Sequence, residues 1–262
     1  NNLNQAMHRK HLKMIRKHTA NEKLLDLGCG SGYFLKFAQQ QGWEVQGVEM
    51  SNYAAEIARK QGISVSTKSV TEANFISGEF EVITMFNVLE HMTHLNEVMA
   101  NNYRWLKPGG LLVVEVPNVN SMQKKIFGGN WVHWDVPRHI FHFSPETIQK
   151  LAEKSGFKVI EEYSLPFSSH EVAGWLHSLS FCLRSKKKEN ISTVPLPIRK
   201  EDFLPLKMKT LKLLISVLCA ELMRVFPVLL YRRAGVKTYL LKKTTPSRES
   251  DSLNNNGNQF SV

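Results

Sequence analysis

Residues 24–34 read LLDLGCGSGYF, in which three glycines at alternate positions follow a short apolar run. The run predicts a buried strand, and Phe34 and Phe37 recur at the spacing of one helix face. A strand, a glycine-rich turn and a helix in this order place free backbone N–H groups where they can face a ligand. The dinucleotide pattern G-x-G-x-x-G is not met, because Tyr33 stands at its third glycine, and no Gly-Lys-Ser/Thr ending of a phosphate loop follows.

Two acidic residues close to this turn narrow the kind of ligand. Asp26 precedes the glycines, where a carboxylate would repel a pyrophosphate but would suit a cationic amine. The next expected strand, WEVQGVEMS at 43–51, ends in Glu49, which is placed to accept hydrogen bonds from both ribose hydroxyls of a nucleoside. The ligand should therefore have a ribose, no pyrophosphate and a positively charged amino-acid end. S-adenosylmethionine meets all three conditions.

Five segments follow one another along the chain: LLDLGCGSGYF, VQGVEMS, FEVITMFNVLEHM, LKPGGLLVVEVPN and GFKV. They resemble, in the usual order and over roughly residues 20–163, the motifs of class I S-adenosylmethionine-dependent methyltransferases. The chain is most similar to the subgroup with a W…D-x-P-R-H-x-x-H-F-S segment, matched here by WVHWDVPRHIFHFS at 131–144. Five motifs in register are a far more specific signal than any single one.

The resemblance implies which residues surround the cofactor, S-adenosylmethionine. Those around its methionine part would be Asp26, Gly28, Gly30 and Gly32. Glu49 would hold the ribose, and Met50 would pack on the adenine.

The resemblance also places the run from Asn87 to Leu89 along the other side of the cofactor. Members of the family often carry an acidic residue near the end of the third strand, facing the adenine amino group. This chain has Lys68-Ser69-Val70 there, so Ser69 or a backbone group would have to make that contact.

Alternating strands and helices predict an α/β fold, a Rossmann-like doubly wound sheet that is mostly parallel, with helices on both faces and the ligand at the carboxyl ends of the strands. The strands are expected near residues 23–27, 44–49, 63–66, 80–86, 110–116 and 157–163. The helices are expected near residues 5–18, 32–41, 52–61, 94–106 and 144–155. The family resemblance adds an antiparallel last strand, VKTYLLKK at 236–243.

The chain divides into five expected parts. They are a basic N-terminal helix, the cofactor-binding core, a loop-rich excursion, an apolar helix with the last strand, and a disordered tail, at 1–22, 23–163, 164–207, 208–243 and 244–262. The net charge of +11 gathers at the two ends, since the core itself is mildly acidic. Basic flanks of this kind indicate what the ends touch rather than what the active site binds.

The apolar stretch at 208–231 has two interpretations. Its uninterrupted apolar part is too short for a membrane span, yet its basic and apolar faces suit a peripheral position on a membrane. The alternative is an ordinary helix that covers the sheet. No signal peptide is recognised, so a cytoplasmic protein is expected, with peripheral contact at the inner membrane face under the first interpretation.

Histidines dominate the expected chemistry, because histidine titrates near neutral pH. His91 follows the fourth strand and is the first candidate for a general base, with loop orientation as the alternative role. The segment at 131–144 suggests a lid over the acceptor, in which His139 would act as a second catalytic residue. The other acceptor contacts expected in the lid are Trp131, Asp135, Arg138 and His142, although Trp131 and one histidine also suit plain structural roles.

No metal is expected. The three cysteines lack metal-binding or disulfide spacing. Some ubiquinone-pathway methyltransferases look similar around Glu90 and His91 and bind a divalent ion through an acidic residue three positions before this pair. That position is Asn87 here, which offers one hard ligand fewer.

Two classes of function compete. The first is methyl transfer to a small-molecule, glycan or lipid-linked acceptor, and the second is methylation or binding of nucleic acid through the basic flanks. Enzymes that methylate base amino groups resemble one another in an Asn/Asp-Pro-Pro-aromatic segment, whereas residues 87–90 read Asn-Val-Leu-Glu. The first class is therefore favoured. A non-catalytic scaffold is disfavoured, because the glycine turn and the ribose-binding acid are both present.

Overall fold

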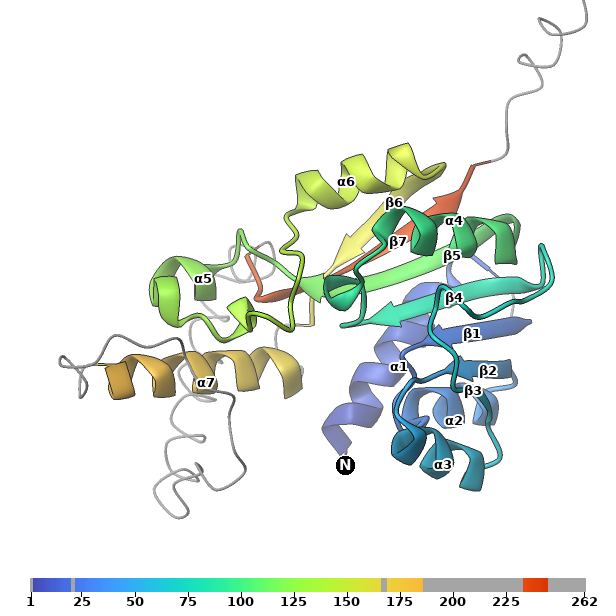
Figure 1. Ribbon diagram of the computed structural model, residues 1–262, viewed down its shortest axis with the longest axis horizontal. Coiled ribbons are helices and arrows are strands. Elements are labelled where there is room, and N and C mark those ends of the chain that lie inside the picture. The colour runs from blue at the N-terminus through green and yellow to red at the C-terminus, as the bar shows by residue number, and fades with distance from the viewer. Residues whose placement is uncertain (1, 20–21, 166–168, 186–232, 245–262) are drawn as a thin grey trace, which may run out of the picture.

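The computed structural model describes residues 2–19, 22–165, 169–185 and 233–244. Its centre is a seven-stranded sheet in the order β3-β2-β1-β4-β5-β7-β6 (Figure 1). The strands are β1 Lys23–Leu27, β2 Glu44–Val48, β3 Ser64–Ser66, β4 Phe80–Phe86, β5 Leu106–Pro117, β6 Phe157–Tyr163 and β7 Val236–Lys243. β1 to β5 pair in parallel, and β7 runs antiparallel between β5 and β6. This confirms the expected Rossmann-like sheet with an antiparallel last strand.

Seven α-helices join and flank these strands in the part of the chain that the structure describes. They are α1 Asn2–Arg16, α2 Tyr33–Gln40, α3 Asn52–Lys60, α4 Leu95–Trp105, α5 Met122–Phe127, α6 Pro145–Lys154 and α7 Ser169–Ser185. Short 3₁₀ turns span Leu89–His91, Gly128–Asn130 and Val132–Trp134. The clearest start signal is at α6, where the Ser144 hydroxyl accepts from the Thr147 N–H and the Thr147 hydroxyl accepts from the Ser144 N–H.

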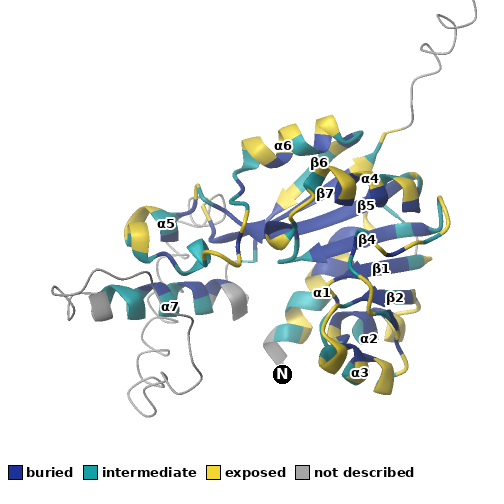
Figure 2. Ribbon diagram, viewed as in Figure 1, coloured by how far each residue is buried: buried dark blue, intermediate teal, exposed yellow. Residues whose placement is uncertain are grey.

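The helices cover both faces of the sheet because each central strand is apolar on both sides. In β1, Leu25 packs in a cluster with residues of α4 and α6, whereas its neighbour Leu24 packs with Leu12 of α1 and Leu35 of α2. Successive strand residues point to opposite faces, so a continuous apolar run supplies both cores. Figure 2 shows the central strands buried and the outer sides of the helices exposed.

The order of the strands reverses between β1 and β4, which places a crevice at the carboxyl ends of these strands. The segments that leave there are the glycine turn after β1, Glu49 after β2 and Asn87 after β4. All three carry residues that the sequence assigned to the cofactor.

Part of the segment expected to be rich in loops, 164–207, is helical. Ser169–Ser185 form helix α7, which packs beside α5 (Figure 1). The sequence of this segment mixes apolar residues with Ser and His, so its helical character depends on packing against α5 and the loop at 131–139 rather than on a regular polar face. Residues 186–207, the stretch 208–231 and the tail from 245 lie outside the described residues. The described helices include none with the length and apolar character that a membrane crossing requires.

Candidate active site

The glycine turn between β1 and α2 is held in a conformation that other residues adopt only under strain. Gly28 has φ +75° and Gly30 has φ +54°, both in the left-handed region. A Cβ on Gly28 would lie 2.4 Å from Cγ2 of Val88, so the turn presses against the chain after β4. A Cβ on Gly30 would meet no protein atom within 4 Å. The turn is therefore packed on one side and open on the side where a ligand would lie.

Glu49 is fixed in place by this turn. Its Oε2 accepts from the backbone N–H of Gly30 at 2.9 Å, and its Oε1 accepts from the N–H of Ser51 at 2.8 Å. Each carboxylate oxygen can accept a further hydrogen bond. The carboxylate is thus preorganised beside the glycine turn, as binding of two ribose hydroxyls requires.

Asp26 is almost fully buried, with 4% of its surface exposed, and the Thr84 hydroxyl donates to its Oδ1 at 2.6 Å. Burial raises the pKa of Asp26 to about 7, and the nearby negative charge of Glu49 adds to the effect, while the Thr84 hydrogen bond opposes it. A cation bound beside Asp26 would favour its ionised form. The charge state of this carboxyl therefore changes near neutral pH.

The other expected cofactor contacts differ in how accessible they are. Gly32 also has φ +75° and begins α2. Met50 is 66% exposed beside Glu49, which suits packing on a bound ring. The Ser69 hydroxyl donates to Glu72 at 2.7 Å. Leu89 needs a correction, because its side chain is 1% exposed and packs in the core, so it does not face a ligand.

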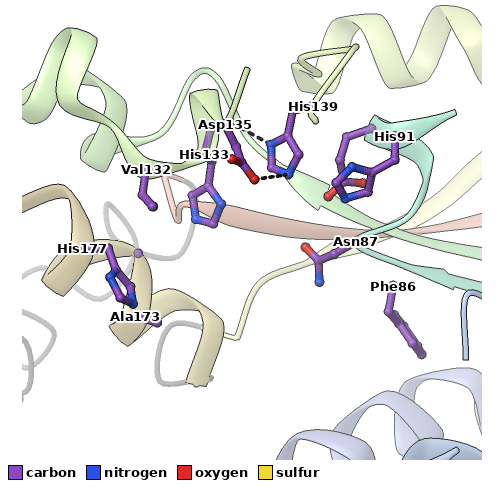
Figure 3. A pocket seen from close by; sticks show the side chains of 11 residues that line it. Phe86, Asn87, His91, Val132, His133, Asp135, His139, Ala173 and His177 are labelled. Carbon is purple, nitrogen blue, oxygen red and sulfur yellow. Dashed lines mark hydrogen bonds and ion pairs between the residues drawn. The ribbon is translucent and has the colours of Figure 1, made fainter. Parts of the chain in front are cut away.

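A cavity of about 370 Å³ lies at the carboxyl end of β4, beside the first half of α7. Its lining residues come from β4 and the segment after it, from the loop at 132–139 and from α7. They are Phe86, Asn87, Glu90, His91, Val132, His133, Asp135, His139, Ala173, Gly174 and His177. Figure 3 shows His177 and Ala173 across the cavity from Asn87 and His91. The lid segment and α7 therefore border the space at the carboxyl end of β4.

Asn87 lies in this cavity with φ +55°, a left-handed conformation that is uncommon outside glycine. Its Nδ2 donates to Oε1 of Glu115 at 3.1 Å, and its backbone N–H donates to the Glu115 carbonyl at 2.8 Å. The two bonds set the direction of the amide, so that its oxygen remains on the cavity side (Figure 3).

Glu90 is the residue whose importance the sequence did not reveal. It lines the cavity with 1% of its surface exposed, and neither carboxyl oxygen has a hydrogen-bond partner among the described residues. Burial raises the pKa of Glu90 to about 8, its own backbone N–H opposes the shift, and the charge of Glu115 adds to it. An unpaired buried carboxyl of this kind is costly, which points to a ligand that completes its hydrogen bonds. The only hint in the sequence is its place next to His91.

Two histidines stand beside Glu90. The Nδ1 of His91 lies 2.8 Å from the backbone oxygen of Arg138, and the Nδ1 of His139 lies 2.8 Å from the backbone oxygen of His133. A carbonyl oxygen only accepts, so Nδ1 carries the proton in both rings and the neutral form keeps a lone pair on Nε2. Burial lowers the pKa of His139. The two rings meet edge to face at 4.7 Å. The Nε2 of His91 is therefore placed to accept a proton, whereas the Nε2 of His139 lies 3.7 Å from Oδ2 of Asp135.

The same three side chains are close enough to share one cation. One ligand atom each from Glu90, His91 and His139 lies within 4.8 Å of the others. Such a set suits a divalent ion of the transition series as well as a proton-transfer site. The absence of a metal stays a prediction from the sequence.

Several other lid residues make contacts within the lid itself. Arg138 is bound to Asp135 through two nitrogens, with its Nη2 2.7 Å from Oδ2, and the Nε2 of His142 donates to the Trp134 carbonyl at 3.0 Å. Trp131 needs a correction, because it is 1% exposed and packs against neighbouring rings, which leaves it no surface for an acceptor. Asp135 alone of the expected non-histidine contacts lines the cavity. His133, Ala173 and His177 line it without having been expected.

The crevice geometry, the glycine turn and the paired acids define an α/β protein that binds a nucleoside cofactor with an amino-acid end. A family model described as "Methyltransferase domain" matches residues 1–162. Ubiquinone biosynthesis O-methyltransferase of Pseudomonas aeruginosa (strain LESB58) is 26% identical over 166 residues, which are 58% of this chain and 72% of that protein. The chain therefore belongs to the methyltransferase-domain family.

Solved structures agree on the fold. A SAM dependent methyltransferase from Archaeoglobus fulgidus has a TM-score of 0.55 and 18% identity, covering 91% of this chain and 94% of that one. Phosphoethanolamine N-methyltransferase 2 of Haemonchus contortus, solved in complex with S-adenosyl-L-methionine, has a TM-score of 0.57 and 18% identity, covering 92% and 53%. The protein is an S-adenosylmethionine-dependent methyltransferase, as the sequence predicts.

Proposed function

We propose that this chain transfers the methyl group of S-adenosylmethionine to a hydroxyl group of a small molecule. This molecule would bind in the cavity of about 370 Å³. One observation carries the proposal: Glu90, His91 and His139 meet at the wall of that cavity. A hydroxyl must lose its proton when it is methylated, so it needs a base within hydrogen-bond reach. The O-methyltransferase named among the relatives supports oxygen as the methylated atom.

When bound, S-adenosylmethionine supplies an electrophilic methyl group for an in-line displacement. The chain itself has to hold the acceptor in line and receive its proton. The Nε2 of His91 is the proton acceptor, since its Nδ1–H is committed to the Arg138 carbonyl. Glu90, which burial keeps protonated at neutral pH, donates a hydrogen bond to the acceptor. His139 packs against the His91 ring and keeps it oriented.

The acceptor class follows from the cavity. Imidazoles are weak bases, so a phenol, which is far more acidic than an aliphatic alcohol, is the hydroxyl they can deprotonate with useful efficiency. A cavity of about 370 Å³ is at the small end of ligand sites and accommodates one aromatic ring with substituents. Asp135, Arg138 and His142 then act by holding the lid in shape, with Arg138 as an anion contact only if its pair with Asp135 opens.

Transfer of tritium-labelled methyl groups from S-adenosylmethionine tests this function. Catechol and 3,4-dihydroxybenzoate are the probes, and phenethylamine, aniline and a short RNA serve as competing acceptor classes. We expect a labelled methyl ether of a catechol and no label in aniline or RNA. Labelling of RNA alone would replace the proposal by the nucleic-acid alternative, and labelling of the amines alone would move the chemistry from oxygen to nitrogen.

Cofactor affinity should depend on pH through Asp26. The pKa of Asp26 is raised to about 7, so its carboxylate form, which attracts the ammonium of the cofactor, increases as pH rises. If only this form binds well, the ionised fraction predicts about an eightfold gain in affinity for S-adenosylhomocysteine from pH 6 to pH 7.5. Calorimetry at both pH values measures it, and Asp26→Asn should bind weakly without this dependence. An unchanged pH dependence in Asp26→Asn would contradict the contact.

A lipid-linked acceptor and contact with a membrane are proposals that rest on the sequence of residues 208–231, which lie outside the described residues. The basic and apolar composition of this stretch predicts binding to anionic vesicles that weakens as salt rises. Flotation with phosphatidylglycerol vesicles measures it, with Leu218→Glu and Leu222→Glu together expected to abolish binding. A wild type that never floats would contradict membrane contact and would favour an acceptor that is dissolved in water.

A further inference from the structure

Helix α7 was not expected from the sequence, yet it supplies one wall of the cavity. Ala173, Gly174 and His177 face the space in which the proposed acceptor binds (Figure 3). Two of the three are the smallest residues available, so the position of the helix backbone itself determines how wide the cavity is. Whatever holds α7 in place therefore determines what fits beside His91.

The carboxylate of Glu171 joins α7 to neighbouring elements through hydrogen bonds. It is 5% exposed, and four N–H groups converge on it. Its Oε1 accepts from Nε2 of Gln123 at 2.7 Å, from Nε1 of Trp175 at 3.2 Å and from the backbone N–H of Gly235 at 3.0 Å. Its Oε2 accepts from the N–H of Val236 at 3.2 Å. These donors belong to α5, to α7 itself and to the start of β7.

The chemistry of these partners defines the state of the carboxyl. Burial raises the pKa of Glu171, whereas all four donors favour the ionised form. A protonated oxygen would turn an O–H toward N–H groups that can only donate, so the carboxylate is the form this arrangement fits. Charge-assisted hydrogen bonds of this kind are stronger than neutral ones and fix geometry.

Glycines at two positions let α7 and the start of β7 pack closely around Gln123, a partner of Glu171. A Cβ on Gly174 would lie 2.6 Å from Oε1 of Gln123, and a Cβ on Gly235 would lie 2.6 Å from its Nε2. The helix and the start of β7 therefore approach Gln123 as closely as glycine permits. On the lid side, the Ser178 hydroxyl accepts from the Val132 N–H at 2.9 Å, which joins α7 to the segment that carries His133 and His139.

We propose that Glu171 is a positioning residue that joins α7 to α5 and to β7, and so sets the acceptor-side wall of the active site. The inference rests on the proposed function, since it takes the cavity to be the acceptor site. Removal of the carboxylate frees four donors and releases α7, while the glycine turn, Asp26 and Glu49 stay as they are. Binding of the acceptor should weaken and binding of the cofactor should not.

Hydrogen exchange measured by mass spectrometry on the full chain tests this directly. In Glu171→Ala we expect at least tenfold faster exchange in peptides from 169–182, with no change in β1. Affinity for S-adenosylhomocysteine, measured by calorimetry, should stay within threefold, and the KM for catechol should rise at least fivefold. Glu171→Gln, which keeps the shape and one acceptor oxygen, should show a smaller effect. Glu97→Ala, an exposed acid on α4, is the control and should change nothing.

Each failure has a distinct meaning. Unchanged exchange in α7 overturns the inference, and so does global unfolding of both Glu171 variants, because the carboxylate would then support the whole fold. Faster exchange with an unchanged KM in an enzyme that methylates catechol also overturns it, since α7 would not be the acceptor wall. A wild type that does not methylate catechol counts against the proposed function, while exchange and cofactor affinity still decide the role of Glu171.

Discussion

We expect Gly28→Val to weaken binding of S-adenosylhomocysteine more than 100-fold, or by more than about 2.7 kcal/mol, in calorimetry. Two physical causes act together. A β-branched residue at φ +75° is strained, and its Cβ would overlap Cγ2 of Val88, which lies 2.4 Å from the ideal position. Relief of this overlap must move the turn or the segment at 87–89, and both border the proposed cofactor site.

A milder pair of substitutions separates ligand contact from backbone strain. Gly30 and Gly78 have φ values of +54° and +70°, and a Cβ on either would meet no protein atom within 4 Å. Ala at either position should therefore cost a similar ~1 kcal/mol of unfolding free energy. Gly78 lies before β4, at the amino end of the parallel strands, whereas the proposed cofactor site lies at their carboxyl ends. Only Gly30→Ala should therefore lose cofactor affinity, by tenfold or more. Equal affinities in the two variants would place the cofactor elsewhere.

His91→Ala should lower kcat with a catechol acceptor by about 100-fold or more, the usual contribution of a general base. The reason is the free Nε2 that the Nδ1–H bond to the Arg138 carbonyl leaves facing the cavity. Affinity for S-adenosylhomocysteine should stay within threefold, since no described contact joins His91 to the glycine turn. Steady-state kinetics and calorimetry on the same preparation measure both quantities.

His94→Ala is the matched control, because this histidine is exposed and makes no side-chain capping bond at the start of α4. It should behave as wild type. Treatment with a chelator should leave turnover unchanged if Glu90 and His91 handle a proton. Loss of turnover that a divalent salt restores would instead show a cation among Glu90, His91 and His139, and a normal kcat in His91→Ala would remove His91 from the chemistry.

The regular elements of the core were predictable because local sequence and tertiary packing agree there. The apolar run at 24–27 is buried on both faces, and Ser144 caps the helix that Pro145 begins, as their residue types indicate. Strand β5 begins at Leu106 rather than near residue 110, because pairing with β4 extends it through the Pro-Gly-Gly segment. Helix α7 was missed, because its sequence carries no clean amphipathic pattern and its stability comes from partners distant in sequence.

The sequence predicted the cofactor side of the candidate site better than the acceptor side. The residues predicted to hold the cofactor, Asp26, Gly28, Gly30 and Glu49, lie at or just after strand ends. A sheet with parallel strands brings such ends together, so spacing along the chain was sufficient to predict that these residues gather at one crevice. The acceptor side has no such rule. Whether Trp131 faces the cavity or the core depends on how the lid packs, and the structure buries it.

The sequence by itself determined the class of fold and the cofactor, because strand periodicity and the glycine turn are local properties and the motifs resemble those of one family. It also predicted which residues surround the cofactor. Only the tertiary structure decided that Glu90 is buried with no hydrogen-bond partner for its carboxyl oxygens among the described residues, that Arg138 is bound to Asp135 and that α7 forms a wall of the cavity. These three features depend on burial and on hydrogen-bond partners. Some of the partners lie dozens of residues away in the sequence, and others lie across the folded lid. Such long-range pairings are set by packing, which local propensity does not encode.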